Sequence, residues 1–384
     1  MEDKRDGIFR IGPIRPPSEA DSLLLQVTSG CTWNKCKFCS LYRGSKFRTY
    51  SVESIKADID TMGKYRDRIL NMNFPDGRFN HEAVWEDIKQ LPFEEQNCYY
   101  MIYNWLRNGG ENVFLQDGNT IVLRPERLAE VLRYLRKVFP GIKRITSYGR
   151  AESLSRVSIE EFQELRAAGL DRIHSGYETG SDVVLDLINK GTTQEQQIRA
   201  GRNIKAAGIE LSLYFMPGVG GKKYSRENAL ETAKVINAVD PDFVRIRTAV
   251  IKQGTDLWEM YKNGGLDIAG EDEKLAEIRL MIENTEGVHS YLASDHIINL
   301  LQNLEGHLDT DKRKLLGEID KYFALKERDK KIYQLARRNG MVTGIKDLKK
   351  IPAGNMRQLE SIVNDITSNE EWDIAMNNLM DRYI

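Results

Sequence analysis

The sequence predicts an α/β fold, an open partial barrel of six parallel strands with helices between them. Short apolar runs alternate along the chain with longer stretches whose apolar residues recur every three or four positions, as in amphipathic helices. A parallel strand pair needs a long crossover connection, and these helices supply it. A closed eight-fold barrel would need two more units than the sequence contains, so we expect a (β/α)6, TIM-like partial barrel.

The predicted strands are short and rich in apolar residues. They span Ser22–Thr28, Asn112–Gln116, Arg144–Tyr148, Arg172–Ser175, Glu210–Phe215 and Phe243–Ile251. The predicted helices between them span Val52–Tyr65, Arg124–Phe139, Ile159–Ala168, Ser181–Asn189, Gln194–Ala207 and Arg226–Ala238. Pro125 at the start of the second helix and Gly169 at the end of the third are typical helix boundaries.

Two segments depart from this alternation and suggest how the chain is divided. Residues 71–110 are too long for a turn and rich in aromatic residues, so we expect a helical insertion there. After about Gly270 the chain has charged pairs at helical spacing and is expected to be helical throughout. The expected domains are therefore an N-terminal extension (1–21), the partial barrel (22–265) and a helical C-terminal region (266–384).

Composition limits the classes of function. The 384 residues carry a formal net charge of -1, which gives no electrostatic case for non-specific nucleic-acid binding. Apolar runs are far shorter than the roughly 20 residues that span a bilayer, and the first residues lack the apolar core of a signal peptide. Four cysteines, three of them clustered, do not form a disulfide scaffold, so a reducing cytoplasm is the expected location.

A cluster of three cysteines is the main indication of a metal or iron–sulfur site. Residues 30–39 read GCTWNKCKFC and place Cys31, Cys36 and Cys39 on one loop after the first strand. Thiolates are ligands for soft centres such as zinc or iron–sulfur clusters. Structural zinc usually takes four ligands, and no second cysteine pair or nearby histidine is present. Three cysteines would ligate three irons of a cubane and leave the fourth open, although unrelated thiols or zinc remain alternatives. Cys98 stands apart and is expected to be a buried structural thiol.

With this loop, the sequence resembles the radical S-adenosylmethionine (radical SAM) superfamily, over about Leu23–Leu257. The family's commonest spacing is CxxxCxxC, whereas this chain has CxxxxCxxC, a spacing shared by one branch that also has the later QDGN loop. The resemblance implies a [4Fe–4S] cluster on the three cysteines, with S-adenosylmethionine chelating the open iron. Reductive cleavage would then give a 5′-deoxyadenosyl radical that abstracts hydrogen from a substrate.

The resemblance also assigns cofactor contacts. Phe38, which precedes the last cysteine, would pack beside adenine, and the turn Met216-Pro217-Gly218 after the fifth strand would contact adenine too. Glu178 lies in a segment similar to the family's GxE motif and would accept hydrogen bonds from the ribose hydroxyls. A role as a helix cap is the alternative.

Two further loops are expected to bind the methionine part of the cofactor. Asp117, Gly118 and Asn119 form the turn after the second strand and would receive the amino group, unless they form a simple Asx turn. Ser147 and Arg150 end the third strand, and the Arg150 guanidinium suits a carboxylate, with an ion pair to Glu152 as the alternative.

The sixth strand and one histidine raise the question of the substrate. Arg245 and Arg247 alternate with apolar residues and should share a face of the strand, which makes an anionic substrate plausible. His296 is a possible acid–base group, but a lone histidine is more often structural. No catalytic acid or base is assigned from the sequence.

The predicted function is thus a radical SAM enzyme, an oxidoreductase by class, acting on an unidentified substrate. A small molecule is favoured over a macromolecule, nucleic acid and membrane are not expected partners, and a flavodoxin or ferredoxin would be the reductant. The alternatives are a non-catalytic cluster-transfer protein, or a radical SAM enzyme that modifies RNA or a protein.

Overall fold

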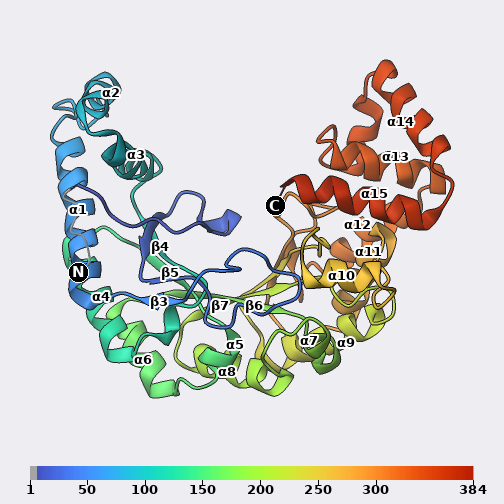
Figure 1. Ribbon diagram of the computed structural model, residues 1–384, viewed down its shortest axis with the longest axis horizontal. Helices are drawn as coiled ribbons and strands as arrows, with labels where there is room; N and C mark the ends of the chain where they lie inside the picture. Colours follow the sequence, from blue (N-terminus) through green and yellow to red (C-terminus); the bar gives the residue numbers. More distant parts are fainter. Residues whose placement is uncertain (1–6, 384) are drawn as a thin grey trace. The chain divides into compact units, whose positions relative to one another are not determined.

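A mostly parallel sheet of eight strands organises the protein, whose computed structural model describes residues 7–383 (Figure 1). The strands follow the order β1-β4-β5-β6-β7-β8-β9-β10, which is open because β1 and β10 stand at its ends. Six strands are those that the sequence predicts: β1 Leu23–Gln26, β4 Asn112–Gln116, β5 Arg144–Tyr148, β6 Arg172–Glu178, β7 Glu210–Phe215 and β8 Phe243–Ile246. The α/β partial-barrel prediction is confirmed.

The pairing register shows why the polar residues gather where the strands end. Leu25 of β1 pairs with Leu115 of β4, and both side chains are fully buried. The next pair along the same strands is Gln26 with Gln116. Carboxyl ends of parallel strands meet at one edge of the sheet, where barrel folds place their binding sites.

Two short strands lie in the region that we expected to be helical throughout. Strand β9 (Tyr291–Ala293) pairs in parallel with β8, and β10 (Gly306–His307) pairs antiparallel with β9. A run of three residues is too short to show a periodicity in the sequence. Pairing with the edge of β8, rather than local preference, decides this conformation.

The predicted helices form and end at recognisable signals. They are α1 Val52–Leu70, α4 Pro125–Val138, α6 Ile159–Ala168, α7 Asp182–Leu187, α8 Gln194–Ala206 and α9 Ser225–Val239. Helix α6 starts with a capping box between Ser158 and Glu161, and it ends at Gly169, whose φ is 113°. A short helix that the sequence did not reveal, α5 (Ala151–Leu154), follows β5.

The aromatic-rich insertion is helical, as expected. It contains α2 (His81–Gln90) and α3 (Phe93–Arg107). Cys98 lies on α3, is buried, and its sulfur contacts the carbonyl of Phe9 at 3.4 Å, so the structural role expected for this thiol agrees with its position. Burial raises the pKa of the Cys98 thiol.

The remaining helices follow β8 and β9. They are α10 Asp256–Lys262, α11 Glu271–Glu283, α12 Lys312–Phe323, α13 Glu327–Arg338, α14 Ala353–Asp365 and α15 Asn369–Met380. Helix α11 packs on α9 and α12, and α13 packs on α14 and α15. None of the helices described is long and apolar enough to cross a bilayer.

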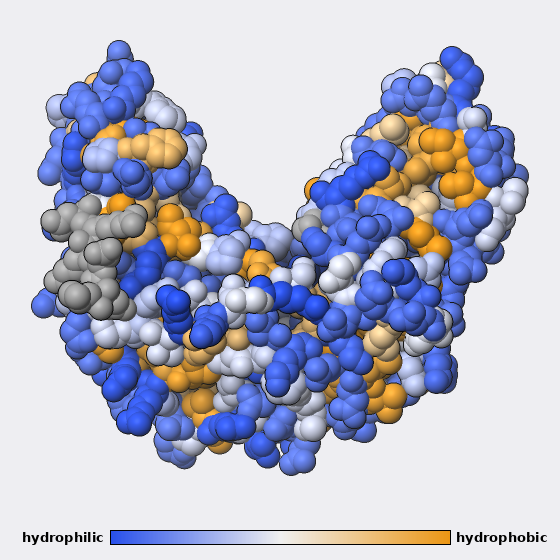
Figure 2. Space-filling view, in the orientation of Figure 1, coloured by the Kyte–Doolittle hydropathy of each residue, from blue (hydrophilic) through white to orange (hydrophobic). Residues whose placement is uncertain are grey.

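The described residues group into two compact units. The first comprises those up to Thr32, together with Gly44–His174 and Ala206–Glu210; the second comprises Trp33–Arg43, Ser175–Lys205 and those from Leu211 on. The face shown in Figure 2 is mostly hydrophilic, with apolar side chains exposed in patches between hydrophilic ones. The division at residues 21 and 265 that the sequence suggested stays a prediction.

Candidate functional site

The cysteine loop lies between two short strands, β2 (Thr28–Ser29) and β3 (Arg48–Thr49), and has no regular secondary structure. Cys31, Cys36 and Cys39 are each partly buried and none is in a disulfide. Within residues 7–383, no three Cys, His, Asp or Glu side chains are gathered in an arrangement that could hold a metal ion. The donor set, three accessible thiols on one loop, fits an iron–sulfur cluster chemically, and the loop presents them without a preformed ligating geometry.

The start of this loop is held by the turn that follows β4. One carboxylate oxygen of Asp117, Oδ2, accepts hydrogen bonds from the side chain of Gln26 at 3.0 Å and from the Gly30 amide at 3.3 Å. Gly30 has a φ of 89°, a conformation that favours glycine. Asp117 is fully buried, so its first role in the structure is to orient the residue before Cys31.

Asn119 joins the same loop to the end of β5. Its Nδ2 donates to the hydroxyl of Thr32 at 3.0 Å, and its Oδ1 accepts from the backbone amide of Arg150 at 3.1 Å. Nη1 of Arg150 also lies 3.4 Å from the Thr32 hydroxyl. Asp117, Asn119 and Arg150, which the sequence singled out separately, are thus connected through the residues that flank Cys31.

The later part of the cysteine loop is held by the turn after α7. Trp33 Nε1 donates to the carbonyl of Asn189 at 2.7 Å, and Asn189 Nδ2 donates to the carbonyl of Lys35 at 3.0 Å. The Lys37 amide donates to Ile188 at 2.9 Å. These three bonds fix the backbone on both sides of Cys36.

Glu178 and Phe38 lie around a lysine that the sequence analysis did not identify. The Nζ of Lys190 is 2.7 Å from Oε1 of Glu178, and both side chains are about nine-tenths buried. The same Nζ lies 5.5 Å from the centre of the Phe38 ring, a cation–π contact. No periodic pattern points to Lys190, but its place in the Asn-Lys-Gly turn that holds the cysteine loop could have drawn attention to it.

The turn after β7 lies next to Glu178. The Met216 amide donates to the Glu178 carbonyl at 2.7 Å. Met216 belongs to a buried apolar cluster, against which Phe38 packs. Pro217 follows, and Gly218 has a φ of 85°, which favours glycine. All five residues expected near adenosine lie in the second unit, and these contacts join three of them, Phe38, Glu178 and Met216.

A buried carboxyl group holds this turn from helix α11. Glu277 Oε2 accepts from the Gly218 amide at 3.0 Å and from Asn228 at 2.8 Å. Burial raises the pKa of Glu277 to about 8, although these hydrogen bonds and the charge of Lys274 oppose the shift. Burial also lowers the pKa of Lys274, whose side chain would clash with a Cβ at position 218. The sequence analysis missed both residues, because a charged residue on an amphipathic helix ordinarily faces solvent.

Ser147, another residue expected to contact the cofactor, lies within strand β5. Its side chain is fully buried, and its hydroxyl donates to the Tyr148 carbonyl at 3.1 Å. In the register of the sheet it pairs with Leu115, an apolar position. Its contact with a cofactor stays a prediction. The ion pair that we considered between Arg150 and Glu152 has a competitor, since Glu152 pairs with Arg156.

The two arginines of β8 differ in their surroundings. Arg245 is buried, and its guanidinium bonds Asp295 at 2.7 Å and Ser212 at 3.0 Å. Arg247, two residues on, is exposed. His296 follows Asp295, and burial together with the charge of Arg247 lowers the pKa of His296 to about 4. At neutral pH this imidazole is uncharged.

The chain is similar in sequence to several known proteins. Residues 25–233 match the model of the Radical SAM superfamily. A tRNA uridine(34) acetyltransferase from Methanocaldococcus jannaschii is 27% identical over 117 residues, which is 30% of this chain and 22% of that protein. An uncharacterized methyltransferase, PH0819 from Pyrococcus horikoshii, is 30% identical over 62% of this chain and 41% of its own length. The chain therefore spans less than half of these relatives.

Solved structures with lower sequence identity are also similar to the chain. The cobalamin-dependent S-adenosylmethionine radical enzyme OxsB, with aqua-cobalamin bound, is 15% identical with a TM-score of 0.44, covering 94% of this chain and 58% of that one. Methylornithine synthase (PylB) is 18% identical with a TM-score of 0.40, covering 88% of this chain and 85% of that one.

Proposed function

The chain belongs to the radical SAM superfamily, and from this premise we propose that Cys31, Cys36 and Cys39 hold the [4Fe–4S] cluster that enzymes of this family use. The family match over residues 25–233 is the observation that carries the proposal. All four cysteines of the chain lie within this range, and three of them lie on one loop. Three thiolates leave one iron of a cubane without a protein ligand. When bound, the cluster and S-adenosylmethionine supply the 5′-deoxyadenosyl radical that abstracts hydrogen from the substrate.

Two groups of residues are proposed to hold S-adenosylmethionine. The first group, which comprises Phe38, Glu178 and the Met216–Gly218 turn, would receive adenosine, and their clustering supports this assignment. Glu178 would accept from the ribose hydroxyls through its carboxylate, which the ion pair with Lys190 orients.

The second group would receive the methionine part of the cofactor. It consists of Asp117, Gly118, Asn119, Ser147 and Arg150. The hydrogen bonds from Asp117 and Asn119 to residues beside Cys31 support a joint role for these loops. Arg150 would offer its guanidinium to the carboxylate.

For the substrate, we propose a small molecule rather than a macromolecule. A formal net charge of -1 offers no general attraction for a phosphate backbone. The relative named for tRNA acetylation aligns with only 30% of the length of this chain. A flavodoxin or ferredoxin would deliver the electron.

The cluster assignment predicts a specific loss in cysteine variants. After anaerobic reconstitution, the wild type should hold about four irons per chain and release 5′-deoxyadenosine when reduced with S-adenosylmethionine. Cys31→Ala, Cys36→Ala and Cys39→Ala should each lose most of the iron and all of the release, because a ligand is missing. Iron analysis and chromatography of the nucleoside provide the measurements.

Cys98→Ala is the matched control, because this thiol is buried on α3 and should keep both iron and activity. A colourless protein with one tightly bound zinc would contradict the assignment. Binding calorimetry separates the cluster-transfer alternative, since a carrier should show no affinity for S-adenosylmethionine.

A further inference from the structure

The turn after β7, which we propose to contact adenine, uses its own backbone polar groups in the fold. The amide of Met216 donates to the last residue of β6 at 2.7 Å. The carbonyl of Pro217 accepts from the Ala249 amide at 2.9 Å, and that of Gly218 accepts from the Gly221 amide at 3.1 Å. Proline has no N–H, so the Gly218 amide is the other backbone donor of the turn. Its partner comes from helix α11.

Glu277 of α11 is that partner. Its Oε2 accepts from the Gly218 amide at 3.0 Å and from Nδ2 of Asn228 at 2.8 Å. The same Nδ2 lies 3.3 Å from the Met216 carbonyl. Glu277 and Asn228 are both buried, so water does not compete for these bonds. The carboxyl group therefore fixes one end of the turn directly and the other end through Asn228.

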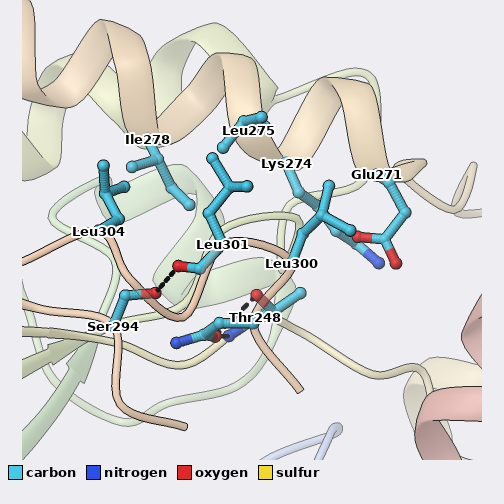
Figure 3. Close-up of a pocket in the computed structure, with 10 residues that line it drawn as sticks. Thr248, Glu271, Lys274, Leu275, Ile278, Ser294, Leu300, Leu301 and Leu304 are labelled. Carbon is cyan, nitrogen blue, oxygen red and sulfur yellow. Dashed lines mark hydrogen bonds between the residues drawn. The ribbon is translucent and has the colours of Figure 1, made fainter. Parts of the chain in front are cut away.

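The side of the turn that faces α11 is closely packed. A Cβ at Gly218 would lie 2.8 Å from Cγ and Cε of Lys274, so the carbon chain of this lysine lies against the glycine. Lys274 and Glu271 line a cavity of about 10 Å³, room for about one water (Figure 3). Beside this cavity, Oδ1 of Asn299 accepts from the Thr248 amide at 3.0 Å. Little space is left into which these segments could shift.

Helix α11 is itself held by α13. Nε of Arg338 donates to Oε1 of Glu271 at 2.6 Å, and Nη1 of Arg338 donates to the Ile298 carbonyl at 2.7 Å. Both charged side chains are buried. A buried ion pair is costly to break, so it determines where α11 lies on α13. Polar contacts thus lead from the C-terminal helices to the turn after β7.

The protonation of Glu277 indicates which substitutions test its role. Burial raises its pKa to about 8, so its carboxyl group is mostly protonated at neutral pH. A protonated carboxyl group still accepts hydrogen bonds. Glutamine is neutral and keeps an acceptor at the same distance along the side chain, whereas leucine fills similar space and has no acceptor.

We propose that Glu277 is a positioning residue for S-adenosylmethionine, because it holds the turn after β7 where adenine packs on it. The inference rests on the proposed function, which assigns this turn to adenine. Both backbone N–H groups of the turn are already paired, so the turn offers adenine an apolar surface beside Phe38, which packs against the same cluster as Met216. Dispersion contacts weaken within a fraction of an ångström, so the position of this surface sets the affinity.

Calorimetric titration of the anaerobically reconstituted protein with S-adenosylmethionine tests the proposal. The dissociation constant should rise about tenfold or more in Glu277→Leu, and by less than about threefold in Glu277→Gln. 5′-Methylthioadenosine, which carries the adenosine part without the amino acid, should lose affinity by the same factor. Release of 5′-deoxyadenosine at saturating cofactor should stay within about twofold of the wild type, so the loss lies in KM rather than kcat.

Met281→Ala is the matched control, because Met281 is a fully buried residue of the same helix and has no hydrogen bond to the turn. It should lose stability and keep the affinity of the wild type. Hydrogen exchange of a peptide that covers residues 212–224, read by mass spectrometry, should become faster in Glu277→Leu and not in Met281→Ala. If Glu277→Leu does not fold, Glu277→Asp, whose carboxyl group is one methylene further from Gly218, should show the same losses.

Three outcomes would overturn the inference: unchanged affinity in Glu277→Leu, an equal loss in Met281→Ala, and a loss for S-adenosylmethionine without a loss for 5′-methylthioadenosine. The last outcome would place the effect at the methionine end of the cofactor. If the wild type binds no S-adenosylmethionine, the proposed function fails and the inference fails with it. If the wild type and Glu277→Leu bind it equally well, the inference alone is rejected.

Discussion

At the scale of single residues, the ion pair between Lys190 and Glu178 is the feature with the clearest energetic consequence. Both side chains are about nine-tenths buried, so neither charge is well hydrated. Removing one partner of such a pair leaves an uncompensated charge in a medium that solvates it poorly. The pair therefore fixes the position of the side chain that we propose for the ribose contact.

Lys190→Met should lower the free energy of unfolding by on the order of 3 kcal/mol. Urea denaturation followed by circular dichroism measures this change. Lys89→Met is the control, because Lys89 pairs with Glu86 on the exposed face of α2 and such surface pairs contribute no more than about 1 kcal/mol. Equal losses in the two variants would contradict the importance of burial here.

Also at the residue scale, Glu277 should make the stability of the protein depend on pH. Its carboxyl group ionises near 4.5 in the unfolded chain, whereas burial raises its pKa to about 8 in the folded protein. The folded state thus binds the extra proton, and its contribution to stability is complete below pH 4.5 and is lost as pH rises through 8.

Glu277→Gln should therefore remove a decline in stability between pH 5 and 8. The difference in unfolding free energy between variant and wild type should grow in favour of the variant by roughly a few kcal/mol over this range. Urea unfolding at several pH values checks it, with Glu283→Gln as the control, since Glu283 of α11 is only partly buried and pairs with Arg279. A pH-independent difference would show that Glu277 is ionised in the folded protein.

At the scale of elements, turns rather than regular elements position the cysteine loop. Gly191 combines a φ of 68° with a close approach to the Trp33 ring, where an added Cβ would lie 2.5 Å from Cε2. Gly208 has a similar φ of 72° but open space around its Cα. Substitutions at the two glycines therefore distinguish the effect of backbone strain from that of steric contact with Trp33.

Gly191→Ala should release iron from the reconstituted protein, because the new methyl group must displace Trp33 and with it the loop that bears Cys36. Gly208→Ala should cost a comparable strain of about 1 kcal/mol and keep its iron. Iron content after gel filtration is the measurement. Retention of full iron in both variants would show that Trp33 does not control the loop.

The elements differ in how far the sequence predicts them. Apolar periodicity locates the six principal strands and their helices, since each has enough residues to show a pattern. Strand β6 was predicted to end at Ser175 and continues to Glu178, because Gly176 reads as a breaker yet allows the close approach of the Glu178 carboxylate. The motif residues that we propose to contact adenosine could be found by resemblance. Lys190, Glu277 and Asn299 could not, because their roles depend on partners distant in sequence.

At the scale of the whole molecule, helix α15 is bound through specific polar contacts to the segment that follows β8. Asn377 of α15 accepts from the Ile251 amide at 2.8 Å and donates to the Ile251 carbonyl at 2.9 Å. It is fully buried. A sequence describes these helices as amphipathic but does not show which buried backbone they satisfy.

Asn377→Ala should lower the free energy of unfolding by roughly 2–4 kcal/mol, because it leaves both polar groups of Ile251 buried without a partner. Denaturation monitored by tryptophan fluorescence measures the loss. Asn369→Ala at the exposed start of α15 should change the stability by less than about 0.5 kcal/mol. Equal effects would mean that α15 contributes only by helix propensity.

The unequal exposure of the four thiols has a practical consequence for assaying the protein. Cys98 is enclosed on α3, whereas the other three cysteines are partly exposed. Alkylation under native conditions should therefore modify three positions and stop. Occupancy of the loop by metal would reduce that number toward zero, so mass spectrometry of the labelled chain becomes a direct gauge of loading, free of background from the fourth thiol.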